Sequence, residues 1–158
     1  VSLILMILVN KKNRELLNIN VKELVLINEM SMTIGLVMLT IGNFLGGMWA
    51  NESWGRYWGW DPKETWALIS IMVYAFVIHM RLIPGLKSNF TFTVASILSF
   101  GSIIMTYFGV NFYLAGLHSY AKDDQEISLV FISITLAIIL ILSLLAYPKY
   151  KKYLKNNR

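Results

Sequence analysis

The sequence has no cysteine, and its 158 residues include only two histidines, three prolines and 15% charged side chains. Without cysteine, a disulfide framework, a thiolate metal site and a cysteine nucleophile are all excluded. Metal chemistry would then have to use histidine, methionine or carboxylate ligands. The scarcity of charge, together with 56% hydrophobic residues, excludes an ordinary soluble domain and favours a protein of the lipid bilayer.

Apolar residues form long blocks of about 20 residues, the length that a helix needs to cross a hydrocarbon core of roughly 30 Å. The predicted crossings are residues 27–50, 65–83, 92–117 and 128–147, the last ending at Pro148. The apolar run at residues 1–9 lacks a basic leader and a cleavage site, so we interpret it as the end of a truncated transmembrane helix. We predict an all-α integral membrane protein, a polytopic helical bundle that forms one domain over residues 1–158 and is the C-terminal part of a longer protein.

The charges between these crossings are divided unequally between the two sides of the membrane. Eleven Lys and Arg and three acids lie on one side, in segments 10–29, 81–87 and 148–158. Three basic and six acidic residues lie on the other side, in segments 51–64 and 118–127. The positive-inside rule places the first side, and with it the C-terminus, in the cytoplasm. The tryptophan-rich segment and His118 are therefore expected on the outer side.

Residues 51–69, NESWGRYWGWDPKETWALI, combine four tryptophans, a tyrosine and five charged side chains. Asp61, Pro62 and Glu64 predict a capped helix start: an N-cap, a proline at the first helical position and a capping box. Each tryptophan taken alone fits the aromatic belt of a membrane interface. Glycines among them instead favour a tight loop that presents several aromatic faces to one flat, apolar ligand. The aromatic residues of this loop and the following helix are Trp54, Tyr57, Trp58, Trp60 and Trp66.

The run WGRYWGWDPKETWALI resembles the tryptophan-rich WWD signature of haem-handling proteins in cytochrome c biogenesis. Its DPKETW portion is most similar to the CcsA, or ResC, branch of System II. The likeness extends over most of the chain through GGMWANESWG, VYAFVIHMRL and YFGVNFYLAGLHSY. It implies that haem b is transported or transiently bound, and that the residues holding it include Trp54, Tyr57, Trp58, Trp60, Asp61 and Trp66.

The same resemblance implies the surroundings of the protein. It predicts a multi-pass protein of the cell inner membrane, with the WWD loop on the periplasmic side. The partners that it implies are a ResB- or CcsB-like membrane subunit, separate or fused upstream, and an apocytochrome c with a C-x-x-C-H motif. No nucleic-acid partner is expected.

Each of the two histidines has a position that suggests a role. His79 follows Pro62 by 17 residues, which puts it ~26 Å along the helix and near the cytoplasmic end of the hydrocarbon layer. An ionisable group there is a functional candidate, although a neutral histidine bonded to a neighbouring helix, or one reaching into the interface beside Arg81, is the alternative. His118 closes the third predicted crossing on the outer side.

The resemblance implies that His79 and His118 are haem-iron ligands, a role that suits imidazole. It also implies that the outer haem has a second axial histidine upstream of the WWD segment. That histidine and its membrane partner are expected before Val1, so the outer site is not expected to be complete within this chain.

The predicted function is haem delivery and attachment to apocytochrome c on the outer face of the membrane. If the protein is an enzyme, it is part of a cytochrome c synthase, or haem lyase, complex that forms thioether bonds, and no catalytic residue is assigned. The alternative is a haem exporter or relay in the manner of CcmC, which hands haem to a separate ligase; the DPKET run favours the first. A membrane electron-transfer cytochrome would need paired histidines within the bundle, and a non-haem protein with an aromatic belt would bind no haem.

Two smaller patterns are interpreted as features of the scaffold. Gly42 and Gly46 form a G-x-x-x-G in the first complete crossing, which predicts close packing against another helix, and Gly109 with Gly116 is interpreted in the same way. The eight methionines are typical of packing or lipid-facing positions rather than of metal ligands.

Overall fold

The computed structural model describes residues 21–114 and 129–156, and every regular element within them is helical. The long helices are α3 (Val21–Trp54), α4 (Pro62–His79), α5 (Asn89–Ile104) and α7 (Leu129–Asn156). The short ones are the 3₁₀ turn η1 (Met80–Leu82), the π-helical turn η2 (Met105–Gly109) and α6 (Val110–Tyr113). Four described segments, 21–54, 62–82, 89–112 and 133–152, are long and apolar enough to cross a membrane. The prediction of an all-α membrane bundle with four complete crossings is confirmed, while the truncated helix predicted at residues 1–9 lies outside the described residues.

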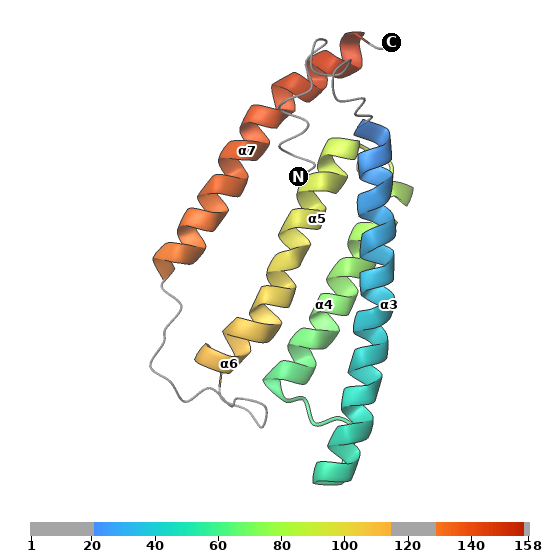
Figure 1. Cartoon of the computed structure of the whole chain (residues 1–158), viewed down its shortest axis with the longest axis vertical. Coiled ribbons are helices and arrows are strands. Elements are labelled where there is room, and N and C mark those ends of the chain that lie inside the picture. Colours follow the sequence, from blue (N-terminus) through green and yellow to red (C-terminus); the bar gives the residue numbers. More distant parts are fainter. Residues whose placement is uncertain (1–20, 115–128, 157–158) are drawn as a thin grey trace.

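Successive long helices run in opposite directions, so different helix ends and loops lie together at each end of the bundle (Figure 1). The start of α3, the η1 turn, the start of α5 and the end of α7 lie at the upper end in this view, here called the basic end. The end of α3, the loop 55–61, the start of α4 and α6 lie at the lower end, here called the aromatic end. Helices α3, α4 and α5 pack against one another, whereas α7 diverges from α5 toward the aromatic end.

The core of the bundle lies near the basic end, where α3, α4 and α5 meet. Phe92 is fully buried there, together with Val21, Val25, Val77 and Met80. The guanidinium of Arg81 lies 4.6 Å from the centre of the Phe92 ring, and its Nη1 forms a 2.9 Å ion pair with Glu29 of α3. Arg81 therefore joins the turn after α4 to both neighbouring helices.

The ends of two predicted crossings need correction. Helix α7 was expected to end at Pro148 but continues to Asn156, because the rings of Tyr147 and Tyr150, on either side of the proline, pack against Phe90. The proline removes one backbone donor, and the ring contacts on both sides of it favour the helix in spite of that loss. The third crossing was expected to continue to residue 117, but the described helix ends at Tyr113, and Leu114 is extended.

The Phe92 contact gives a test of the core. Phe92→Ala should lower the free energy of unfolding by about 3 kcal/mol, because it leaves a cavity and removes the ring beneath Arg81. The control is Phe100→Ala on the same helix, where the ring is 55% exposed, and it should change stability much less. The measurement is unfolding by SDS titration in mixed micelles, and equal losses in the two variants would contradict the assigned core.

Candidate functional site

The site begins with the carboxylates that start α4. The Asp61 side chain accepts a 3.2 Å hydrogen bond from the backbone N–H of Lys63 and a second one from the N–H of Glu64. In return, Oε2 of Glu64 accepts hydrogen bonds from the backbone N–H of Asp61, at 3.3 Å, and of Gly59, at 2.7 Å. The predicted capping box is confirmed. The Glu64 carboxylate also binds Gly59 and so holds the loop to the helix start.

The loop 55–61 is tight because its backbone adopts conformations that glycine favours. Gly55 ends α3 with φ +69° and donates its N–H to the carbonyl of Asn51. Gly47 lets the loop approach α3, since an added Cβ there would lie 3.2 Å from the carbonyl oxygen of Tyr57. The guanidinium of Arg56 fills the space that a side chain at Gly59 would need. The loop therefore folds back onto the end of α3, as the glycines predict.

A cavity of about 460 Å³ lies between α3, the loop and α4. One wall is a strip of small residues on α3 that includes Gly42, Gly46 and Ala50, and the opposite wall includes Tyr57, Trp58 and Ala67. Its remaining lining residues are Met38, Leu39, Asn43, Gly47, Trp49, Lys63, Glu64 and Thr106. Its volume lies within the usual range for small-molecule sites, roughly 300–1,000 Å³, and its mostly apolar walls are typical of them.

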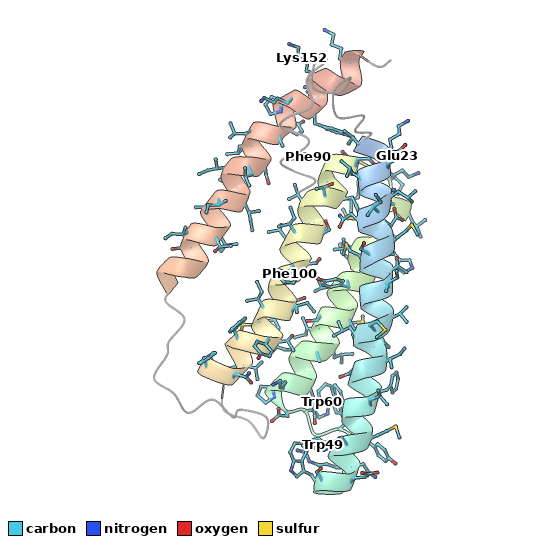
Figure 2. The ribbon with its side chains drawn as sticks, in the orientation of Figure 1. Glu23, Trp49, Trp60, Phe90, Phe100 and Lys152 are labelled. Atoms are coloured by element: carbon cyan, nitrogen blue, oxygen red, sulfur yellow. The ribbon has the colours of Figure 1, made fainter. Side chains whose placement is uncertain are left out.

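Two of the predicted site residues, Tyr57 and Trp58, line this cavity. The others do not line it: Trp54, Trp60, Asp61 and Trp66. Trp58 lines it and packs edge to face with Trp60, with ring centres 5.7 Å apart at 90°. Trp54 packs edge to face with Trp49, with ring centres 5.0 Å apart at 81°. Trp60 is 71% exposed and has a left-handed backbone, with φ +57°. Figure 2 shows Trp49 and Trp60 at the same end of the bundle, opposite Glu23 and Lys152.

Hydrogen bonds of polar groups join α4 to the π-helical turn beside the cavity. The hydroxyl of Thr106 lies 3.1 Å from the carbonyl oxygen of Trp66, 2.8 Å from that of Ser102 and 3.0 Å from the hydroxyl of Ser70. It has one proton to donate, so it can serve one carbonyl at a time, while the fully buried Ser70 can donate to it. Such hydrogen bonds between helices position the cavity wall in a membrane protein. Trp66 therefore takes part through its backbone.

His79 lies at the other end of α4, in the part of the bundle that holds Arg81. It is exposed, and its Nδ1 lies 2.7 Å from the carbonyl oxygen of Ala75 in the preceding turn. Since a carbonyl can only accept, Nδ1 carries the proton and Nε2 keeps its lone pair in the neutral ring. This is the arrangement common in metal-binding histidines, whose second nitrogen is held by a backbone carbonyl or a carboxylate. The hydrogen bond of His79 thus lies within its own helix, and the alternative of a hydrogen bond to a neighbouring helix is not observed among the described residues.

The structure describes one of the two predicted metal ligands, His79. His79 follows Lys63 by 16 residues of α4, about 24 Å along the helix, so it is remote from the cavity. His118 lies outside the described residues. Within residues 21–114 and 129–156, no group of three His, Cys, Asp or Glu side chains could hold a metal ion. The assignment of both histidines as haem ligands stays a prediction.

Within residues 21–114 and 129–156, the strip of glycines on α3 does not pack against another helix as the sequence predicted. Gly42 and Gly46 were expected to pack closely against another helix, but a Cβ added at either would meet no heavy atom within 4 Å. They face the cavity instead. The G-x-x-x-G spacing produces a surface without side chains on one face of a helix. The spacing alone does not show whether another helix or a ligand lies against that surface. The atoms nearest to a Cβ added at Gly109 belong to Met105 of its own π-helical turn, and Gly116 lies outside the described residues.

These features define a multi-pass helical membrane protein with a cavity beside a tryptophan-rich loop. The sequence model of the cytochrome C assembly protein family matches residues 1–118, and the chain belongs to this family. It is 56% identical to protein NrfI of Wolinella succinogenes over 137 residues, which are 87% of this chain and 15% of that protein.

The chain is also similar to two proteins named cytochrome c biogenesis protein CcsA. That of Cuscuta reflexa is 48% identical over 102 residues, 65% of this chain and 33% of the relative. That of Synechococcus sp. (strain JA-3-3Ab) is 51% identical over 87 residues, 55% of this chain and 25% of the relative. The chain thus spans a third or less of the length of each of these proteins.

The capping box can be tested through stability. Asp61→Ala should lower the free energy of unfolding by about 1 kcal/mol, because it leaves backbone N–H groups at the start of α4 without their acceptor. Asp61→Asn keeps an acceptor at the N-cap and should retain most of the stability. Glu52→Ala, at an exposed position near the end of α3, is the control for loss of an acid. If Asp61→Ala behaved like Glu52→Ala in an SDS titration, the cap would not hold this helix.

Proposed function

We propose that the chain is the haem-handling part of a cytochrome c biogenesis protein and that haem binds in the cavity between α3, the loop 55–61 and α4. The observation that carries the proposal is the pairing of a side-chain-free strip on α3 with an aromatic wall. A flat, mostly apolar ring can lie against glycines while Tyr57 and Trp58 cover its other side or its edge. Membership of the cytochrome C assembly protein family agrees with this ligand.

In this proposal the protein delivers haem b to apocytochrome c and takes part in its attachment on the outer, periplasmic face of the inner membrane. In attachment, the S–H of each cysteine in a C-x-x-C-H motif adds across a haem vinyl group, forming a C–S bond with no leaving group. The contribution of this chain is to bind and orient the ring while one edge stays accessible. A ResB- or CcsB-like subunit, separate or fused upstream, is the proposed membrane partner.

The proposed orientation rests on the charges at the two ends of the bundle. Arg81, Lys87 and the basic residues of the C-terminal part of α7 lie at the basic end, which the positive-inside rule assigns to the cytoplasm. The cavity lies at the opposite, aromatic end. Haem made in the cytoplasm would therefore have to cross the length of the bundle to reach it.

The runner-up function is a haem relay that hands its cargo to a separate ligase. His79 favours a relay step, because its Nδ1 is held by Ala75, which leaves the Nε2 lone pair for a metal, and because it stands about 18 Å along α4 from Ala67 in the cavity wall. The two functions share the cavity, and they differ in whether the bound haem is attached to apocytochrome by this protein or by another one.

The glycine wall gives the test of the cavity. Gly46→Leu should weaken haem binding at least tenfold in the complete membrane protein that contains this chain, because its side chain would occupy the space of the ring. The matched control is Gly35→Leu on the same helix, which also has open space at Cβ but does not line the cavity. Both changes raise helix propensity, so the comparison isolates the filling of the site. The measurement is the Soret absorbance during haem titration, and equal affinities in the two variants would reject this site.

The histidines call for a spectroscopic test. His118→Ala should weaken haem bound at the outer site and change its spin state, because an axial imidazole is lost. His79→Ala should leave that outer spectrum unchanged and lower the amount of haem that reaches it in cells. Resonance Raman spectra and haem content of the purified variants report the two effects. Wild-type spectra and haem content in both would remove the histidines from the proposal.

A further inference from the structure

Lys63 is the cation in the wall of the cavity, and its contacts suggest what the ligand must carry. It occupies the second position of α4, is half-buried, and lines the cavity together with Glu64. Its Nζ donates a 3.1 Å hydrogen bond to Oδ1 of Asn111, which α6 supplies from the other side of the π-helical turn. This bond leaves the Lys63 ammonium with two further donors.

The carboxylates next to Lys63 are used elsewhere. Glu64 accepts two backbone N–H groups of the loop and its cap, and Asp61 accepts the backbone N–H groups of Lys63 and Glu64. Among residues 21–114 and 129–156, no ion pair joins the Lys63 ammonium to a carboxylate. The one contact to Asn111 supplies an acceptor but no negative charge. Lys63 thus brings a positive charge to a cavity whose other walls are mostly apolar.

The Glu64 carboxylate is held by backbone N–H groups of the loop and forms no ion pair with Lys63, so the remaining donors of the ammonium can bind an anionic group of the ligand. A ligand that fits both parts of the cavity has a flat apolar body and an anionic group at one edge. The π-helical turn places Asn111 against Lys63, and such turns are frequent at functional sites.

We infer that Lys63, positioned by Asn111, binds a carboxylate of the ligand in this cavity, which for haem is a propionate. This inference rests on the proposed function, since it takes haem as the ligand, and it adds the group that fixes the orientation of the ring. With a propionate at Lys63, the ring lies between the glycine strip of α3 and the aromatic wall. A charge-assisted hydrogen bond at one edge then decides which edge of haem remains free.

The test compares haem with its dimethyl ester, in which both propionates are neutral. The complete membrane protein in phosphatidylcholine nanodiscs should bind haem about tenfold more tightly than the ester, a factor typical of one charge-assisted hydrogen bond. Lys63→Gln should reduce this preference to about twofold or less, mainly by weakening the binding of haem. Lys63→Arg should keep most of it. Asn111→Asp should also reduce the preference, because its carboxylate would pair with Lys63 in place of the ligand.

Lys87→Gln is the matched control, because Lys87 is an exposed lysine at the opposite end of the bundle and its loss should leave the preference unchanged. Equal affinities of the wild type for haem and ester, or an unchanged preference in Lys63→Gln, would overturn the inference. The proposed function would stand in either case if Gly46→Leu still weakened both ligands. If Gly46→Leu affected neither ligand, the cavity itself would be rejected.

A phospholipid headgroup is the other source of an anion near a membrane surface. Adding phosphatidylglycerol to the nanodiscs separates the two. If the ligand carboxylate occupies Lys63, the tenfold preference should persist in these discs. Its disappearance from the wild type would show that the headgroup phosphate takes the lysine, and would overturn the assignment to the ligand.

Discussion

The carboxylate of Glu64 is the contact on which the arrangement of the aromatic end depends. By accepting the N–H groups of both Gly59 and Asp61, it fixes the last residues of the loop to the first turn of the helix that follows. Without it, Gly59 would lose its hydrogen bond to α4, and the loop would be held to the helix start by the bonds of Asp61. The cavity is therefore a product of hydrogen bonding at a helix start, to which the aromatic side chains add their walls.

The two ends of the bundle are held in different ways. At the basic end, the buried Phe92 and the ion pair of Arg81 with Glu29 join α3, α4 and α5 closely. At the aromatic end, the contacts are hydrogen bonds of short polar groups, such as Thr106 with Ser70, and the glycines leave space open. Close packing at one end and space at the other place a ligand cavity where the helices are held apart by the loop.

The sequence predicted the elements that depend on local chemistry. The capping box of Asp61 and Glu64 and the four crossings follow from residue types and from hydrophobic length, and the structure has them. The continuation of α7 past Pro148 could not be predicted, because it depends on ring contacts with Phe90, which is about 60 residues away in the chain. The role of Lys63 was likewise hidden, since its partner Asn111 is 48 positions further along. The spacing of the glycines of α3 was noticed, but only the structure shows that Gly42 and Gly46 face the cavity.

Trp60 has a consequence for how the protein balances folding against recognition. Its backbone lies in the left-handed region, where a residue with a bulky side chain is disfavoured by about 1 kcal/mol or more relative to glycine, and its ring is mostly exposed. Neither feature helps the chain to fold, and the edge-to-face contact with Trp58 offsets only part of that cost. A glycine at this position would make the loop easier to form. The indole stands in a place that folding disfavours, as is common for side chains that meet something outside their own chain.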